Sequence, residues 1–306
     1  MSERRVDPFT GRGVIIAPGR RGLGAAKPGG LPPIAGRCPF CPGHEADTEA
    51  SVAAWPSEAA WQVRVVANKF PVSEPGAHEV GVDAREHDVD LADLSLEHAT
   101  AMLRLYRDRM AALEARDGAR TSLLFRNRGR RAGSSQPHPH TQMVALAWTP
   151  AEVALRWEVA QAFHAAHGES VHAAALREEL EAGTRVLREE PRAVLFCPRA
   201  PTRPFEMRLM LREPSARFSG ASDADLEALA SLLVDAFRRL RDRASVPDSN
   251  LVLRQPPMAA RGPAAAWHLE LLPRTGGDAG FELSSGEMIV VVSPEESADR
   301  LRAAPP

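Results

Sequence analysis

The sequence predicts an α+β protein made of two copies of one unit, each a mostly antiparallel sheet with a flanking helix, packed as one body. Two observations carry this prediction. The chain has 306 residues, which is enough for about two domains of ordinary size. The order strand, helix, strand, strand also occurs twice along it. We therefore expect an N-terminal half at residues 1–150 and a C-terminal half at residues 151–306.

The first half begins with residues 1–36, which are rich in Gly, Pro and Arg and predict an extended arm with one short strand, or a solvated arm. Apolar residues recur at helical spacing from Ser95 to about Arg116, and Asp117-Gly118 ends that helix. Residues 127–131 form a basic loop that contains glycine. The expected strands are residues 14–16, 63–66, 78–82 and 121–125.

The second half opens with a predicted helix that has Thr149 as its N-cap, Pro150 in its first turn and Gly168 near its end. A second helix begins at Ser222, with Asp225 as its capping partner, and its apolar stripe consists of Leu226, Leu229, Leu233, Phe237 and Leu240. The expected strands are residues 193–196, 205–211, 250–253 and 267–271. Histidines mark the repeat, because His140 and His268 lie 128 positions apart (268 minus 140) and the same offset relates His78 to Glu206 (206 minus 78).

Composition limits the class of function. Apolar residues make up 44% of the chain and charged residues 25%, which is ordinary for a globular protein. The net charge of -2 provides no general polyanion-binding surface, so we expect no nucleic-acid partner. No apolar segment follows the polar N-terminus, and no run is long enough to span a bilayer. We expect a cytoplasmic protein with no membrane partner.

The three cysteines do not form a disulfide framework. Cys38 and Cys41 have C-x-x-C spacing within a tight turn that points two sulfurs at one place, whereas Cys197 stands alone. The spacing is typical of metal or redox sites, and no thioredoxin-like pattern surrounds it. Two thiolates with two imidazoles would complete a tetrahedral zinc site. The residues alone leave open which of the ten histidines join the pair.

The segment Ser134 to Gln142 carries the chemistry. His138 and His140 are separated by one proline, Gln142 follows two residues later, and an apolar strand-like run lies behind them. Such a segment suits the edge of a phosphate site better than a core. The equivalent positions of the second half, at the offset of 128, are Ala266, His268 and Glu270. Because the outer histidine is lost there, we assign the chemistry to the first half.

Several short segments of the chain occur together in one known family. They are Asp7-Pro8, Cys38-Pro39-Phe40-Cys41-Pro42-Gly43, Val65-Val66-Ala67-Asn68-Lys69-Phe70-Pro71, His78-Glu79-Val80, Asn127, Gly133-Ser134-Ser135-Gln136-Pro137-His138-Pro139-His140-Thr141-Gln142 and Ala279-Gly280-Phe281-Glu282. In this order and spacing, nearly the whole chain resembles the galactose-1-phosphate uridylyltransferase family of the histidine-triad superfamily. The H-P-H-x-Q element is the most specific part. The resemblance implies two histidine-triad-like halves, the second degenerate and contributing to a sugar site.

The resemblance also implies a nucleotidyltransferase that exchanges a nucleoside monophosphate between a nucleotide sugar and a sugar 1-phosphate, as in galactose metabolism. His140 matches the nucleophile that holds the nucleotide covalently, and a neutral imidazole suits that task because it attacks and leaves phosphorus near pH 7. Gln142 and Ser135 match residues that stabilise the phosphoryl group. The implied nucleotide-binding residues are Arg20, Asn68, Asn127, Gly133 and Ser134.

One structural zinc is implied, with Cys38, Cys41, His87 and His138 as its ligands. Some relatives carry a second metal, but Ala266 and Arg254 replace histidines of that site here, so we predict a single zinc per chain. Leu23 replaces the second of two nucleotide-binding arginines, and the basic loop offers substitutes in Arg128, Arg130 and Arg131. Glu282 matches a sugar-binding residue that reaches the site across a dimer interface, which implies a homodimer.

Two other functions stay open at this point. A phosphorylase or hydrolase of the same superfamily would use phosphate or water to resolve the nucleotidyl-His140 intermediate. A catalytically idle nucleotide-binding protein would keep the zinc fold without turnover, although intact His138, His140 and Gln142 count against it.

Overall fold

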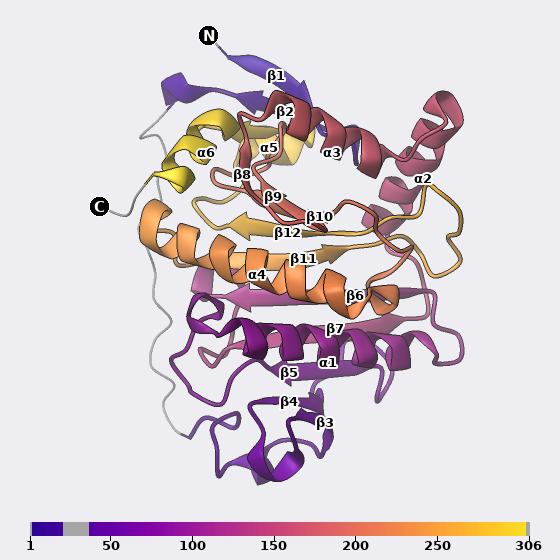
Figure 1. The fold of residues 1–306 in the computed structure, drawn as a ribbon, viewed down its shortest axis with the longest axis vertical. Coiled ribbons are helices and arrows are strands. Elements are labelled where there is room, and N and C mark those ends of the chain that lie inside the picture. The colour runs from indigo at the N-terminus through magenta and orange to yellow at the C-terminus, as the bar shows by residue number, and fades with distance from the viewer. Residues whose placement is uncertain (1, 21–36, 304–306) are drawn as a thin grey trace.

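The computed structural model describes residues 2–20 and 37–303, and its main feature is one ten-stranded sheet (Figure 1). The strand order is β3-β4-β5-β7-β6-β11-β12-β10-β9-β8, and neighbouring strands are antiparallel. The strands are β3 (Ser51–Trp55), β4 (Val63–Ala67), β5 (His78–Val82), β6 (Thr121–Arg128), β7 (His140–Leu146), β8 (Val186–Glu189), β9 (Ala193–Phe196), β10 (Met207–Leu211), β11 (Ser249–Arg254) and β12 (His268–Pro273).

The described residues also form a smaller sheet and six α-helices. The small sheet has the order β1-β2-β13, with β13 parallel to β2. Its strands are β1 (Glu3–Val6), β2 (Gly13–Ile16) and β13 (Met288–Val290). The helices are α1 (Leu96–Glu114), α2 (Ala151–His167), α3 (Val171–Ala182), α4 (Asp223–Arg239), α5 (Gly280–Ser285) and α6 (Pro294–Arg302). Within the described ranges, no helix has both the length and the apolar character of a membrane span. The predicted α+β class is confirmed.

Helices α1 and α4 lie side by side across one face of the large sheet (Figure 1). Ser95 caps α1 by accepting a hydrogen bond from the backbone N–H of His98. Ser222 and Asp225 form a capping box at the start of α4. The predicted apolar stripes of both helices are buried: Ala99, Met102, Leu103, Tyr106, Met110 and Leu113 in α1, and Leu226, Leu229, Leu233, Phe237 and Leu240 at α4. Burial of each large side chain contributes about 1.5–3 kcal/mol, which fixes the helices on the sheet.

Some local predictions were wrong. Pro150 is the N-cap of α2, with extended backbone and no side-chain hydrogen bond, so Thr149 does not cap the helix. The N-terminal arm contains the hairpin β1–β2 where one strand was expected; β1 is polar and largely exposed, so it shows no alternation of apolar residues. Strand β6 continues to Arg128 and takes the first part of the predicted basic loop. The elements that sequence patterns missed are β1, β3, β8, β13, α3, α5 and α6.

The large sheet is continuous through its middle, because β6 pairs with β11 and Asn127 lies opposite Asn250. The order strand, strand, helix, strand, strand lies on each side of this join, with α1 in the first group and α4 in the second. The division into two copies at residue 150 stays a prediction. What the sheet does establish is that β5 and β7 are neighbours, which sets the geometry of the site described next.

Candidate active site and metal centre

The turn after residue 37 brings Cys38 and Cys41 against His87 and His138. All four ligand atoms lie within 4.8 Å of one another. Among the described residues, these four form the group of side chains that could hold a metal ion. The Cys41 sulfur lies 3.3 Å from His87 Nδ1 and 3.7 Å from His138 Nδ1, and the Cys38 sulfur lies 3.8 Å from His138 Nδ1. Tetrahedral zinc, with bonds of about 2.3 Å to sulfur and about 2.0–2.1 Å to nitrogen, separates such atoms by about 3.5 Å. The donor set therefore fits zinc.

Backbone contacts hold these ligands in place. His138 Nε2 lies 2.9 Å from the carbonyl oxygen of Ala84, so its Nδ1 lone pair faces the sulfurs. The Cys38 carbonyl accepts from the Cys41 N–H at 3.3 Å and from His44 Nδ1 at 2.7 Å, which closes the turn. Burial, together with the neighbouring Cys38 thiol, raises the pKa of Cys41 to about 11. A bound cation reverses that effect, because it stabilises the thiolate.

His140 begins strand β7 two residues after His138. Its Nδ1 lies 2.9 Å from the carbonyl oxygen of His138, and a carbonyl only accepts, so Nδ1 carries the proton of the neutral ring. The Nε2 lone pair is left free for a reacting group. Burial lowers the pKa of His140, with the His138 carbonyl opposing the effect, and this favours the neutral ring. The ring of Phe40, from the cysteine turn, lies 5.6 Å from that of His140.

Gln142 is the next residue on the same face of β7, because side chains alternate along a strand. Its amide oxygen lies 3.1 Å from Nε2 of His78 in the neighbouring strand β5. Asn68, at the end of β4, lies against the same histidine, with its Nδ2 3.1 Å from His78 Nε2. The structure thus groups Asn68 and Gln142 around His78, a residue to which the sequence assigned no role.

A buried carboxylate behind His140 was also missed by sequence reasoning. Asp83 is fully buried and accepts hydrogen bonds from Tyr106 at 2.6 Å, Thr141 at 2.8 Å and Arg126 at 2.7 Å. Its backbone N–H donates to the carbonyl of Pro139, the residue between the two histidines, at 3.0 Å. Burial and the adjoining carboxylate raise the pKa of Tyr106, so the phenol stays protonated and donates. An acidic residue directly after a strand was the only sequence signal.

The loop before His138 carries Gly133, Ser134 and Ser135 of the predicted phosphate and nucleotide residues, and Asn127 lies at the end of β6. Gly133 has φ 81°, a left-handed conformation that favours glycine. Ser134 is buried and donates to the Gln136 carbonyl at 2.6 Å, whereas Ser135 is exposed. Asn127 accepts from Asn250 at 2.7 Å. Asn127, Ser134 and His138 line one cavity beside the metal cluster.

Arg20 and Glu282 lie elsewhere in the chain. They line a cavity of about 520 Å³ near α5 and β13, whose lining includes none of the zinc-type ligands or His140. Helix α5 contacts β13, a strand of the small sheet, whereas β5 and β7 are neighbours within the large sheet (Figure 1). A single chain therefore does not bring these two residues to His140. Leu23, the departure from the arginine pair, falls outside the described residues. Arg128 is held by Asp90 at 3.0 Å, so this substitute is already engaged.

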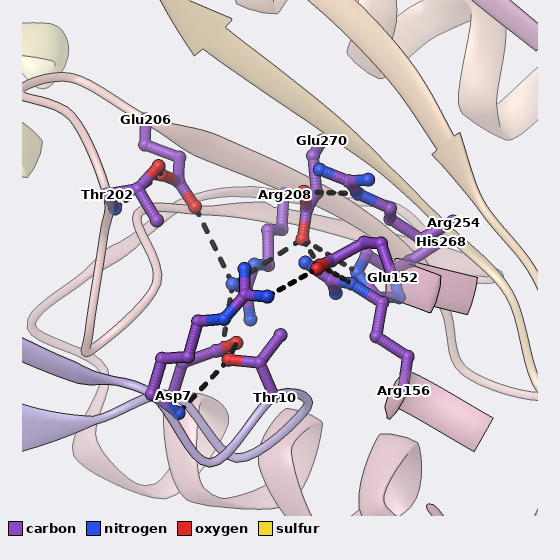
Figure 2. Close-up of polar contacts among 11 residues, drawn as sticks. Asp7, Thr10, Glu152, Arg156, Thr202, Glu206, Arg208, Arg254, His268 and Glu270 are labelled. Atoms are coloured by element: carbon purple, nitrogen blue, oxygen red, sulfur yellow. Dashed lines mark hydrogen bonds and ion pairs between the residues drawn. The ribbon is translucent and has the colours of Figure 1, made fainter. Parts of the chain in front are cut away.

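The region around Glu270, the residue at the predicted repeat offset from Gln142, is filled by ion pairs (Figure 2). Glu270 accepts from Arg254 at 2.7 Å and from Arg156 at 3.3 Å, and it lies 3.2 Å from His268 Nε2. The guanidinium groups lower the pKa of Glu270 against the effect of burial. Guanidinium groups, including that of Arg254, thus surround this carboxylate. Arg208, also buried, pairs with Asp7 at 2.9 Å and anchors the turn between β1 and β2.

Comparison with known proteins agrees with this architecture. Residues 20–148 match the N-terminal domain of a domain of unknown function, DUF4931. The chain is 26% identical to ADP-glucose phosphorylase of Arabidopsis thaliana over 98% of its own length and 92% of that protein. It is 29% identical to galactose-1-phosphate uridylyltransferase of Streptomyces lividans, over 68% of this chain and 57% of that protein.

Solved structures of such proteins have a similar fold. The crystal structure of the Arabidopsis thaliana ADP-glucose phosphorylase with bound ADP-glucose superposes with a TM-score of 0.88, at 26% identity and 99% coverage of both chains. A structure described as uridylyltransferase superposes with a TM-score of 0.77, at 25% identity and coverage of 99% and 98%. In sequence and in fold, the chain is thus similar to galactose-1-phosphate uridylyltransferase-like proteins, which include a nucleotidyltransferase and a phosphorylase.

Proposed function

We propose that this protein transfers a nucleoside monophosphate from a nucleotide sugar to a phosphate-bearing acceptor through a nucleotidyl-His140 intermediate. The observation that carries the proposal is the hydrogen bond from His140 Nδ1 to the His138 carbonyl. It fixes the tautomer whose Nε2 lone pair can attack phosphorus, without a separate base to remove a proton.

The reaction proceeds through two successive displacements at the α-phosphorus. In the first, the Nε2 lone pair forms a bond to the α-phosphorus, and the bond from phosphorus to the bridging oxygen breaks, so sugar 1-phosphate leaves with the electron pair. In the second, an oxygen of the acceptor phosphate forms a bond to the same phosphorus. The bond to Nε2 then breaks and the lone pair returns to His140. One phosphate site serves both partners in turn.

Neighbouring residues stabilise the charge that gathers on the phosphoryl oxygens. Gln142 donates from its amide nitrogen, and Ser135 with the backbone amides of the loop after Gly133 donates from the other side. Ser134, Asn68 and Asn127 contact the nucleotide. The exposed position of Ser135 supports this role, because its hydroxyl is free to reach a ligand.

Zinc is the metal that we assign to Cys38, Cys41, His87 and His138, in one structural site per chain. Bound there, it would cross-link three segments of the chain, the turn with Cys38 and Cys41, the loop with His87 and the segment with His138, and four protein ligands would leave it no open position. The carbonyl of His138 then has a fixed position, and this carbonyl is the group that sets the His140 tautomer.

The acceptor distinguishes two forms of the proposal. Transfer to a sugar 1-phosphate corresponds to the uridylyltransferases, and transfer to inorganic phosphate corresponds to ADP-glucose phosphorylase. The likeness to the phosphorylase extends over nearly the whole of both chains and has the higher TM-score, 0.88 against 0.77. We therefore place phosphorolysis of a nucleotide sugar, with ADP-glucose as the first donor to test, ahead of the uridylyl exchange.

A homodimer is part of the proposal. Arg20 and Glu282 line a cavity that is separate from His140 in one chain, so a second copy would supply them to the nucleotide and sugar. Arg203 also lines this cavity, but it pairs with Asp278 at 2.6 Å and is therefore already engaged, as Arg128 is by Asp90.

Intact mass spectrometry tests the reaction. The protein is incubated with ADP-glucose, UDP-glucose or UDP-galactose, and we expect a covalent nucleoside monophosphate adduct that is absent from His140→Gly. The variant must keep its metal content and circular dichroism spectrum. Release of the adduct by phosphate indicates the phosphorylase, release by sugar 1-phosphate indicates the transferase, and release by water alone indicates a hydrolase. A folded, metal-loaded protein that forms no adduct with any donor would instead be a binding protein.

A further inference from the structure

His78 lies between two residues of the proposed site without contacting the reacting atoms. It is 2% exposed and begins strand β5. Val80, two residues on, pairs with Gln142 in β7, so His78 is the diagonal neighbour of Gln142. Diagonal neighbours on one face of a sheet are within reach of long side chains. The register of β5 and β7 therefore places the imidazole against the Gln142 amide.

The tautomer of His78 follows from a backbone contact. The N–H of Val72 lies 3.2 Å from His78 Nδ1, and a backbone N–H only donates, so Nδ1 is an acceptor without a proton. The neutral ring then carries its proton on Nε2. Burial lowers the pKa of His78, which supports the neutral form. Nε2 lies 3.1 Å from the oxygen of the Gln142 amide and donates to it.

The orientation of Gln142 is the consequence. An amide oxygen and nitrogen are nearly indistinguishable by shape, and only their hydrogen bonds decide which way the group points. Since His78 Nε2 can only donate, Gln142 must present its oxygen to it. The NH2 group of Gln142 then points to the other side, and no hydrogen-bond acceptor for it is found among residues 2–20 and 37–303.

Asn68 secures the histidine from the other side. Its side-chain oxygen accepts from the Phe70 N–H at 2.8 Å, so its NH2 group faces His78. That nitrogen is 3.3 Å from Nδ1 and 3.1 Å from Nε2. Because the Asn68 nitrogen is nearly equidistant from both ring nitrogens, it lies over the face of the imidazole ring. It therefore does not compete with the hydrogen bond that the Nε2–H group donates to Gln142 in the plane of the ring. The backbone N–H of Asn68 also donates to the His78 carbonyl at 2.8 Å.

We propose that His78 is a positioning residue that holds the Gln142 amide with its NH2 group directed at the transferred phosphoryl group. The inference rests on the proposed nucleotidyl transfer. The terminal torsion of glutamine has two broad minima about 180° apart, so an unrestrained amide also presents its oxygen to the phosphoryl oxygens. That arrangement is repulsive and provides no donor. The hydrogen bond from His78 excludes this orientation of the Gln142 amide before the substrate binds.

The test is a double-mutant cycle in which the single-turnover rate of adduct formation is measured for the wild type, the two single variants and the double variant. His78→Leu removes the donor, and we expect the rate to fall about tenfold with little change in nucleotide-sugar affinity, a smaller loss than the 10²–10³ for a whole oxyanion donor. His78→Gln restores a donor and should recover most of the rate. With Gln142→Ala, adding His78→Leu should cause no further loss, because the amide that His78 orients is gone.

His172→Leu is the matched control. His172 is also 2% exposed, and its Nε2 lies 2.8 Å from the Leu211 carbonyl, but it lies in α3 of the second half. The His172→Leu variant should keep the wild-type rate of adduct formation per folded molecule. Additive losses in the double variant, or equal losses in His78→Gln and His78→Leu, would overturn the proposal.

A measurement on the wild-type protein covers the case in which His78 variants do not fold. Long-range proton–nitrogen NMR spectra should show the His78 ring protonated on Nε2 and unprotonated on Nδ1; the opposite tautomer, or a doubly protonated ring at pH 7, overturns the proposal. Failure of the proposed function has a different signature. The wild-type protein then forms no adduct with any donor, whatever the tautomer of His78.

Discussion

His140 Nδ1 lies 2.9 Å from the carbonyl oxygen of His138, so the residue that faces the cysteines also sets the protonation of its neighbour. The two histidines have different partners: His138 faces Cys38 and Cys41 through its Nδ1, and His140 keeps its Nε2 free. A disturbance of the cysteine cluster should therefore reach the phosphate site through one backbone carbonyl. The predictions below test this region and the elements that support it.

Metal content tests the cysteine cluster. Elemental analysis of the wild-type protein should give about one zinc per chain, and Cys38→Ser should lose it and unfold at lower temperature, because a structural metal contributes folding free energy. Cys197→Ser is the control, since Cys197 is fully buried but lies outside the cluster and should keep the metal. A value near two zinc ions per wild-type chain would contradict the replacement of a second metal by Arg254 and Ala266.

Asp83→Asn should destabilise the protein strongly. The substitution leaves the guanidinium of Arg126 without its 2.7 Å charge partner in a fully buried position, and Asp90 is 3.7 Å away. Breaking a buried ion pair by removing one partner costs about 3–5 kcal/mol. Urea unfolding should show this loss. Tyr106→Phe removes one hydrogen bond to the same carboxylate and should cost less, about 1–3 kcal/mol. Equal stability of Asp83→Asn and the wild type would rule out the network as described.

Gly81→Ala should destabilise the protein where Tyr106 of α1 packs against β5. A Cβ atom at Gly81 would lie 2.4 Å from Cε1 of Tyr106, which is fully buried and has no room to move away. Overpacking of this kind costs about 1–3 kcal/mol. Gly118→Ala is not a suitable control, since Gly118 has a left-handed φ of 74°. Gly19→Ala is better, because no atom of the described residues lies within 4 Å of its added Cβ, and it should leave the midpoint of thermal unfolding unchanged.

Stability should fall in mild acid, partly through His172. Burial lowers the pKa of His172 from the ordinary 6.5 to about 4, and the Leu211 carbonyl opposes the effect only in part. Below pH 6.5 the unfolded chain therefore binds a proton that the folded chain excludes, so the free energy of unfolding falls as the pH drops from 6.5 to 4. The loss from this residue is on the order of 3 kcal/mol.

His172→Gln tests this by removing the titrating group while keeping a donor for the Leu211 carbonyl. Urea unfolding at pH values between 4 and 7 should show a shallower acid slope than the wild type. His167→Gln, at an exposed position, should keep the wild-type slope. An unchanged slope in His172→Gln would show that His172 is protonated in the folded protein.

Local periodicity determined much of the fold. The apolar stripes of α1 and α4 were read from spacing, and Ser222 with Asp225 located the start of α4. Segments that are polar or short were missed, as β1 was, because an edge strand with solvent on both sides needs no apolar alternation. The cysteine spacing and the segment from Ser134 to Gln142 were also visible, since their residue types are close together in the chain.

Tertiary structure decided which distant residues meet. Cys38 and His138 are 100 positions apart, and residue spacing left open which of the ten histidines join the cysteines; the resemblance implied His87 and His138, and the folded turn brings these two to the sulfurs. Asp83 and Tyr106 come together because α1 packs on β5, a contact that no local pattern encodes. The sequence by itself therefore determined the reactive segment. The folded backbone decided the tautomer of His140, because it places the His138 carbonyl against Nδ1, and the packing of β5 against β7 decided the orientation of Gln142, because it supplies His78 as the partner.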